Sequence, residues 1–263
     1  MSKQNLLSAN PLLGQEIHRR FDEFGPIQVF DDGNKRYLSF GTTDEQSCQL
    51  KSQPFQLQHD YLRCMLAVLS QYPQPLTITS ATVLGLGGGS LSAALWQQLP
   101  RAHIHAVELR AAVAQIAYQF FQLPRDKRLT VHTNDAVDFV STQVKQQQKT
   151  QLLFSDLYLA DGLNQVQQQT DFLEQCGEYL THDGWLVLNL WKEHRSDAQL
   201  LSTIKTLFPT VLQTTTHDGN WIIWASRQKP VDKKQARINC KVLQPAFGFN
   251  PWGFCKVFYR FFK

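Results

Sequence analysis

The chain has 263 residues, of which 43% are hydrophobic and 18% are charged, with 14 Gly and 11 Pro. This is the composition of an ordinary globular protein, and it excludes a disordered chain, a collagen and a long coiled coil. Residues 227–263 contain nine Lys/Arg and one acid, a balance of +8, whereas residues 1–226 contain 17 basic and 21 acidic residues, a balance of −4. Because a nucleic-acid enzyme more often carries positive charge around its site, we expect no nucleic-acid partner.

Targeting and redox signals are weak. The opening MSKQNLLSANPLLG is too polar for a secretory signal, and no apolar run approaches the ~18 residues of a membrane span. We therefore expect a cytoplasmic protein. The cysteines form no CxxC pair, which indicates reduced thiols rather than a disulfide framework or a zinc site. They are Cys48, Cys64, Cys176, Cys240 and Cys255.

The N-terminal part reads as β-structure. Two alternating apolar runs flank the turn-forming DDGN in residues 26–40, which predicts a hairpin, and a third strand is expected near residues 47–51. Residues 58–71 then show apolar side chains at helical spacing, ended by YPQP. We therefore predict a small β-rich domain over residues 1–57.

From Thr79 onward, apolar strands alternate with helical patterns. The strands are TVLGL, IHAVEL, LTVHTN, LLFSD and WLVLNL, followed at the end by the pair TVLQTTT and NWIIWAS. This alternation predicts an α/β fold with a doubly wound, mostly parallel seven-stranded sheet and an antiparallel end. Residues 58–226 would form this nucleoside-binding domain, with its ligand at the carboxyl ends of the strands.

Residues 227–263 are expected to form a basic, aromatic tail. Its last 17 residues, FGFNPWGFCKVFYRFFK, hold eight aromatic and three basic side chains. We expect this segment to pack on the body or on a dimer partner, and a peripheral membrane anchor is the alternative. A homodimer therefore stays open.

A glycine-rich turn, VLGLGGGSL, follows the first strand of the predicted sheet and places Gly85, Gly87, Gly88 and Gly89 before a helix. Glycines there let a ligand approach the backbone at the helix N-terminus. Glu108 ends the next strand, 21 residues after Gly87, where a carboxylate can accept hydrogen bonds from both ribose hydroxyls. The pair favours a nucleoside site over a purely structural turn.

Two more carboxylates follow strand ends. Asp135 and the backbone N–H of Ala136 could read adenine, with Leu109 against the ring face, although an Asp in TNDAV also suits a helix N-cap. Asp156 could orient an amine or accept its proton, with helix capping as the alternative. The histidines show no convincing ligand pair, so we expect no metal.

These residues lie in motifs that resemble a known family. In order, GPIQVF, RYLSFG, EQSC, HDYLRCML, VLGLGGGSL, HAVELR, RLTVHTNDAVDF, LLFSDLYLADG and HDGWLVLNLW are similar to spermidine synthases and bacterial spermidine synthase-like proteins, which share a class I methyltransferase-type fold. The resemblance runs from Gly25 to Ser226. It implies that decarboxylated S-adenosylmethionine binds with its ribose on Glu108 and its adenine on Asp135 and Ala136, and that Asp156 holds the attacking amine.

The chain also departs from the family pattern. Ser90 replaces the Asp that holds the aminopropyl ammonium, and Leu159 replaces the second Asp of the strand-four motif, although Asp161 follows two residues later. Gln58, His59 and Asp60 stand where the family has Tyr-His-Glu. The candidates for acceptor binding are Gln46, His59, Asp60, Tyr158 and Asp161.

Three functions follow from this pattern. The first is a spermidine synthase-like transferase that uses S-adenosylmethionine or its decarboxylated form and a small amine or other nucleophile, with weak putrescine activity. The second is an S-adenosylmethionine-dependent methyltransferase, because loss of the carboxylate at Ser90 could admit the methionine carboxylate. The third is a non-catalytic nucleoside-binding or interaction protein.

Overall fold

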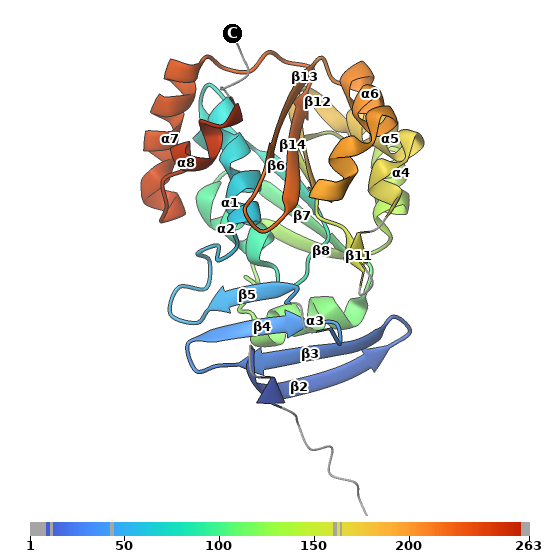
Figure 1. The fold of residues 1–263 in the computed structure, drawn as a ribbon, viewed down its shortest axis with the longest axis vertical. Coiled ribbons are helices and arrows are strands. Elements are labelled where there is room, and N and C mark those ends of the chain that lie inside the picture. Colours follow the sequence, from blue (N-terminus) through green and yellow to red (C-terminus); the bar gives the residue numbers. More distant parts are fainter. Residues whose placement is uncertain (1–8, 11–12, 43–44, 160–161, 164, 259–263) are drawn as a thin grey trace, which may run out of the picture.

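The computed structural model describes residues 9–10, 13–42, 45–159, 162–163 and 165–258. The N-terminal part is an antiparallel five-stranded meander (Figure 1). Its strands are β1 (Ala9–Asn10), β2 (Gly14–Asp22), β3 (Gly25–Asp31), β4 (Lys35–Ser39) and β5 (Ser47–Leu50). The predicted hairpin is β3–β4 and the predicted third strand is β5, whereas β1 and β2 were not predicted from the sequence.

The β3–β4 turn forms for a local reason. Asp31 Oδ1 accepts a hydrogen bond from Gly33 N at 2.8 Å, and Asp32 Oδ1 accepts one from Asn34 N at 2.9 Å. Gly33 has φ +97°, a conformation that glycine adopts without steric cost. The DDGN sequence therefore fixes the register in which β3 and β4 pair.

The next segment is helical but mixed in type. The predicted helix over residues 58–71 is α1 (Asp60–Leu66), which continues as the 3-10 helix η1 (Ala67–Gln71). A second 3-10 turn, η2 (Pro75–Thr77), begins at the second proline of the YPQP that was expected to end the helix. Every residue of η1 is buried, so this segment belongs to the core.

The main sheet has seven strands in the order β13–β14–β12–β9–β6–β7–β8. The five strands from β12 to β8 are parallel to one another. Strand β14 pairs antiparallel with both β12 and β13. The predicted doubly wound sheet with an antiparallel end is confirmed. The strands are β6 (Ser80–Leu84), β7 (His103–Glu108), β8 (Leu129–Thr133), β9 (Thr150–Ser155), β12 (Leu180–Trp191), β13 (Thr210–Thr215) and β14 (Asn220–Ser226).

Helices cover both faces of this sheet (Figure 1). One apolar core contains α1, η1, α2, α7 and α8, and the other contains α4, α5 and α6. The remaining helix, α3, packs Val113 and Ile116 against Ile27 and Leu38 of the N-terminal sheet and so joins the two parts of the molecule. The helices are α2 (Ser90–Gln98), α3 (Ala111–Phe120), α4 (Ala136–Lys145), α5 (Thr170–Tyr179), α6 (Ala198–Leu207), α7 (Lys233–Phe247) and α8 (Trp252–Cys255).

The basic tail packs on the body. Cys240, Leu243 and Phe247 of α7 are buried in the first core, and the ring of Phe258 stacks on Trp224 at 3.9 Å between centroids. The packing interpretation of the tail therefore holds over residues 233–258. The outer face of α7 exposes Ile238 and Val242 instead of aromatic side chains.

Candidate active site

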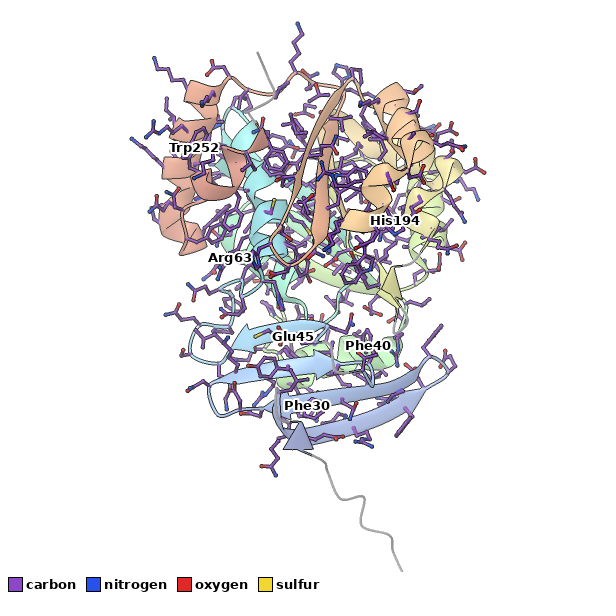
Figure 2. All side chains as sticks on the ribbon, viewed as in Figure 1. Phe30, Phe40, Glu45, Arg63, His194 and Trp252 are labelled. Atoms are coloured by element: carbon purple, nitrogen blue, oxygen red, sulfur yellow. The ribbon has the colours of Figure 1, made fainter. Side chains whose placement is uncertain are left out.

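A pocket opens where the order of the strands reverses, between β6 and β9, at the carboxyl ends of the parallel strands. The N-terminal sheet closes it from the other side, and Figure 2 shows Phe40 and Glu45 at this junction. Such a position is where doubly wound sheets bind their ligands. The lining residues include Phe40, Gln46, Ser47, Tyr61, Gly85, Gly87, Ser90, Glu108, Leu109, Arg110, Asp135, Ala136, Asp156 and Tyr158.

The glycine turn leads from β6 into α2. Gly85, Gly87 and Gly89 have φ values of +91°, +53° and +82°, which side chains larger than hydrogen rarely adopt. A Cβ on Gly85 would lie 2.2 Å from the backbone oxygen of Asp156. The absence of a side chain at Gly85 therefore lets the turn pack closely against the backbone that follows β9.

The N-terminal sheet touches this turn directly. Gly88 N donates a hydrogen bond to Ser47 Oγ at 2.8 Å, and a Cβ on Gly87 would lie 2.8 Å from the same oxygen. Ser47 is the first residue of β5. The β-rich domain thus helps to hold the loop that would carry a nucleoside, a contact that the sequence analysis did not anticipate.

Glu108 is buried at the end of β7, and its carboxylate faces the glycine turn. Oε2 accepts hydrogen bonds from Leu86 N at 3.2 Å and Gly87 N at 3.4 Å, and Oε1 accepts one from Arg110 N at 2.9 Å. Burial raises the pKa of Glu108, and these three N–H groups oppose the rise. The same carboxylate therefore orders the loop and lines the pocket.

Asp135 is the N-cap of α4. Its Oδ1 accepts hydrogen bonds from Val137 N at 2.7 Å and Asp138 N at 3.3 Å. Asp135 also lines the pocket together with Ala136 and the 37% exposed Leu109. Capping and ligand contact are therefore compatible at this residue, and its adenine role stays a prediction.

Asp156 follows β9, and its partly buried carboxylate lies in the pocket. Asn189 Nδ2 donates to Asp156 Oδ1 at 2.7 Å, and the hydroxyl of Tyr61 also hydrogen-bonds the carboxylate. Burial raises the pKa of Asp156 to about 6, against the lowering effect of these two donors. A carboxyl group with such a pKa changes its charge close to neutral pH, as a general base requires.

The backbone around Asp156 is fixed as well. Asp156 N donates to Leu84 O at 2.9 Å, so the strand ends of β9 and β6 are joined. The buried Gln167, in η3 (Gln165–Gln168), accepts a hydrogen bond from Ser155 Oγ at 2.6 Å and donates to Leu157 O at 2.9 Å. Gln167 therefore anchors the segment that carries Asp156.

The candidates for acceptor binding divide into two groups. Gln46 and Tyr158 line the pocket, and Tyr158, in β10 (Tyr158–Leu159), packs edge-on against Trp191. Trp191, the last residue of β12, is 39% exposed. Asp161 lies outside the described residues, before the short strand β11 (Gly162–Leu163).

His59 and Asp60 are not among the residues that line the described pocket. His59 Nε2 lies 3.6 Å from Glu45 Oε1, and its ring stacks on Tyr61. Asp60 pairs with Arg63 at 3.0 Å. Asp60 therefore forms an ion pair within α1 and does not line the described pocket.

Ser90 lies in the wall of the pocket with a hydroxyl that the described residues leave unpartnered. It is the first residue of α2, is 9% exposed and lines the pocket. Its Oγ has no hydrogen-bond partner among the described residues. A buried hydroxyl without a partner is unfavourable, so this group is suited to a polar atom of a ligand.

Sequence reasoning missed several residues of the site. Asn189 is an amide in the otherwise apolar strand WLVLNLW, and this polar residue at a core position was a signal that could have found it. Tyr61 appeared only as part of the apolar face of a helix. Ser47 and Arg110 come to the pocket through contacts between the two parts of the chain, which spacing in the sequence does not reveal.

The comparisons with known proteins fit this architecture. No protein-family model matches the chain. A polyamine aminopropyltransferase of Vibrio vulnificus is 28% identical over 196 residues, which are 73% of this chain and 64% of that protein. The chain is similar to polyamine aminopropyltransferases. The match spans less than two thirds of that relative.

Methyltransferases are a second group of similar proteins. An "eEF1A lysine and N-terminal methyltransferase homolog" of Drosophila melanogaster is 29% identical over 172 residues, covering 62% of this chain and 26% of that protein. Aminopropyltransferases and methyltransferases are both transferases, so both groups of similar proteins consist of transferases.

Solved structures show the same fold. A probable spermidine synthase from Corynebacterium glutamicum has a TM-score of 0.72 at 18% identity, over 87% of this chain and 86% of that chain. The human methyltransferase-like protein 13 in complex with SAH has a TM-score of 0.65 at 20% identity, over 73% of this chain and 93% of that chain. The fold predicted for this spermidine synthase-like chain, a class I methyltransferase-type fold with an N-terminal β-rich part, is confirmed.

No helix among the described residues is long and apolar enough to cross a bilayer. No group of three or more His, Cys, Asp or Glu side chains in this part of the chain is arranged to hold a metal ion. All five cysteines are buried and free.

Proposed function

We propose that the chain transfers an alkyl group from an S-adenosylmethionine-type nucleoside to a small amine or another small nucleophile. The observation that carries this proposal is Asp156. Its carboxylate lies in the pocket at the strand-order reversal, is held by Asn189 and Tyr61, and has a pKa raised by burial to about 6. We also propose a cytoplasmic location, for which the five buried cysteines without a disulfide are suited.

The pocket suits a nucleoside donor. Gly85 and Gly87 of the glycine turn line the pocket, and Glu108 beside them would accept hydrogen bonds from ribose hydroxyls. Asp135 and Ala136 follow the next strand, β8, and would hold the adenine together with Leu109, which follows Glu108. The lining residues include three acids, whereas the one base, Arg110, is paired with Asp22. This balance of charge favours a cationic ligand.

Sulfonium chemistry requires little of the protein. The donor supplies an activated carbon, so that a C–N bond forms, the C–S bond breaks with its electron pair on sulfur, and the amine loses one proton. The carboxylate of Asp156 would orient the amine and take this proton. The closed pocket would contribute orientation and exclusion of water, which account for much of the rate in such reactions.

The choice between the two donors depends on Ser90. A hydroxyl at this position provides no charge for an aminopropyl ammonium, and its unpartnered Oγ lies in the pocket. This observation favours the second candidate function, an S-adenosylmethionine-dependent methyltransferase. The acidic lining favours the decarboxylated donor, which carries one more net positive charge.

Calorimetric titration tests the proposal. The intact chain would be titrated with decarboxylated S-adenosylmethionine, S-adenosylmethionine and methylthioadenosine, and transfer to putrescine and other small amines would then be followed by mass spectrometry. We expect one donor to bind at least tenfold more tightly than the other, and Asp156→Asn to keep donor binding and lose transfer. Binding of none of the three nucleosides would overturn the proposal.

A further inference from the structure

The residues that hold Asp156 extend beyond the pocket wall. Asn189, in β12, is 1% exposed and donates from Nδ2 to Asp156 Oδ1 at 2.7 Å. Its Oδ1 accepts a hydrogen bond from Nδ2 of Asn220 at 3.0 Å. Asn220 opens β14 and is itself 8% exposed. Two buried amides therefore connect the antiparallel end of the sheet to the carboxylate.

The sheet register explains why these amides meet. Asn189 is directly opposite Ile222 in the β12–β14 pair, and Trp191 is opposite Asn220. Asn189 and Asn220 are thus diagonal neighbours on one face, a distance over which amide side chains interact. On the other side, Leu188 of β12 pairs with Ser155 of β9. The next residues, Asn189 and Asp156, therefore lie side by side.

An amide has a donor end and an acceptor end, so its orientation matters beside a carboxylate. If the Asn189 side chain turned over, its Oδ1 would face the Asp156 oxygens and the hydrogen bond would become a repulsion. The bond from Asn220 Nδ2 favours the orientation in which Asn189 presents its N–H groups to Asp156. Asn220 thus acts on Asp156 through Asn189, without touching the carboxylate.

Tyr158 adds a further restraint from the pocket side. Its hydroxyl donates to the backbone oxygen of Asn189 at 3.3 Å and also hydrogen-bonds the side chain of Asn220. Asn220 is anchored in turn by Thr216, whose Oγ1 accepts a hydrogen bond from Asn220 N at 3.1 Å. The two amides are therefore fixed by the β13–β14 hairpin as well as by each other.

We propose that Asn189 and Asn220 are positioning residues that fix the orientation and the charge state of the Asp156 carboxylate. This inference rests on the proposed function in one respect, which is that Asp156 meets the acceptor. The arrangement of the two amides around the Asp156 carboxylate does not depend on the acceptor. A charge-assisted hydrogen bond stabilises the ionised form, so its loss raises the pKa of the carboxyl group. Removal of either amide is expected to raise the pKa of Asp156 by about one unit.

The test is a titration of Asp156 in the intact chain, labelled with ¹³C at the aspartate carboxyl carbon. The Asp156 signal would be identified by its disappearance in Asp156→Asn. We expect its midpoint to move to higher pH by about one unit in Asn189→Leu, which removes the donor, and in Asn220→Ser, which releases the Asn189 amide. If Asn189→Leu does not fold, Asn220→Ser decides the question, because a small polar residue is retained beside Thr216.

Asn239→Leu is the matched control. Asn239 is also a buried amide, 2% exposed, and it donates to Ser70 O and Tyr72 O in the core around α7, away from the pocket. Its loss should destabilise the fold and leave the Asp156 midpoint unchanged. An unchanged midpoint in a folded Asn220→Ser variant would overturn the inference, as would the same shift in Asn239→Leu.

The titration also separates this inference from the proposed function. It needs no acceptor and no donor, so it remains informative if no transfer is observed. A shifted midpoint together with full transfer by Asp156→Asn would leave the positioning role intact and remove Asp156 from the reaction. Loss of transfer in Asp156→Asn together with unshifted midpoints in the two amide variants would keep Asp156 in the reaction and overturn the positioning role.

Discussion

Arg110 Nη2 donates to Asp22 Oδ1 at 2.7 Å, and this ion pair joins the N-terminal sheet to the wall of the pocket. Arg110 is 6% exposed, and its guanidinium also donates to Gly25 O and lies over the ring of Phe40. Its backbone N–H holds Oε1 of Glu108. The β2–β3 turn therefore supports the carboxylate that is proposed to bind ribose.

We predict that Asp22→Ala weakens nucleoside binding although Asp22 does not line the pocket. The unpaired Arg110 charge should destabilise the fold by about 3 to 5 kcal/mol and loosen the segment that positions Glu108. Affinity for methylthioadenosine should fall about tenfold, which corresponds to about 1.4 kcal/mol, as measured by calorimetry.

Asp31→Ala is the control for that variant. Asp31 pairs with Arg36 and Lys51 in the same N-terminal sheet and does not line the described pocket. We expect it to destabilise the fold and to leave methylthioadenosine affinity unchanged. Equal affinities for Asp22→Ala and Asp31→Ala would show that the ion pair with Arg110 is structural only.

Nucleoside affinity should also depend on Glu108 and Asp135. A ligand hydroxyl or amine that loses its buried acceptor costs about 1 to 3 kcal/mol, so Glu108→Gln and Asp135→Ala should each weaken methylthioadenosine binding by about 5- to 150-fold. Glutamine is chosen at Glu108 because alanine would also remove the acceptor for Leu86 N and Gly87 N.

The neighbouring Asp138 provides the comparison for Asp135. It lies in the first turn of the same helix, α4, and is absent from the lining of the described pocket. Asp138→Ala should therefore bind methylthioadenosine normally. If Glu108→Gln and Asp135→Ala also bind normally, the assignment of the nucleoside site is wrong.

The strands after Thr79 could be predicted because they are continuous apolar runs and the helices between them are amphipathic. Strand β2 could not be predicted, because the residue at its buried position, Glu16, carries a charge. Glu16 is fully buried and hydrogen-bonded to Arg19 and Gln28, whereas Phe21 is 64% exposed. This inverts the alternation of apolar and polar residues on which strand prediction depends.

The site was predictable where its residues follow strand ends, since parallel strands bring their carboxyl ends to one edge. Glu108, Asp135 and Asp156 were found in this way. Asn189 and Asn220 required the register between β12 and β14, and Ser47 required the packing of one domain on the other. Such relationships depend on tertiary topology, which local periodicity does not encode.

The raised pKa of Asp156 leads to a prediction about stability. Burial raises this pKa from 3.8 to about 6, so between these values the folded state binds more protons than the unfolded state. Stability contributed by Asp156 is therefore present below about pH 4 and lost as the pH rises through about 6. The shift of about two units corresponds to at most about 3 kcal/mol, reduced by solvent contact of this partly exposed group.

Asp156→Asn should consequently raise the melting temperature at pH 8 and have little effect on it at pH 4, and transfer should be lost at pH 8. Thermal unfolding at the two pH values, followed by circular dichroism, measures this difference. Asp183→Asn, at an exposed position of β12, serves as the control and should leave the melting temperature nearly unchanged. Destabilisation by Asp156→Asn at pH 8 would contradict a cost of burying this charge.

The packing of the tail on the body leads to a separate prediction about the free energy of unfolding. Phe258 is 2% exposed and stacks on the buried Trp224, so Phe258→Ala should lower the free energy of unfolding by about 3 to 5 kcal/mol. Methylthioadenosine should still bind, because neither ring lines the described pocket. Lys256→Ala, at an exposed position two residues earlier, should leave the free energy of unfolding nearly unchanged. Loss of methylthioadenosine binding in a folded Phe258→Ala variant would instead place the tail over the site.

The acceptor gives the last prediction, because here the chain departs from the proteins it resembles. Putrescine carries two ammonium groups at neutral pH, and Ser90 and Leu159 stand where the family has carboxylates. Each missing charge-assisted hydrogen bond is worth about 1.5 to 3 kcal/mol, or about one to two orders of magnitude in binding or rate. We therefore expect weak or absent spermidine formation from putrescine and decarboxylated S-adenosylmethionine.

A double variant, Ser90→Asp with Leu159→Asp, should recover part of this activity, and addition of Asp156→Asn should abolish it. Ser92→Asp provides the comparison, because Ser92 is a buried serine of the same helix that does not line the described pocket. Asp161 is the residue that could supply the missing carboxylate without any substitution, so Asp161→Asn in the parent tests for that substitute. Rapid spermidine formation by the parent chain, measured by chromatography of the products, would overturn the prediction and indicate a plain aminopropyltransferase that uses putrescine.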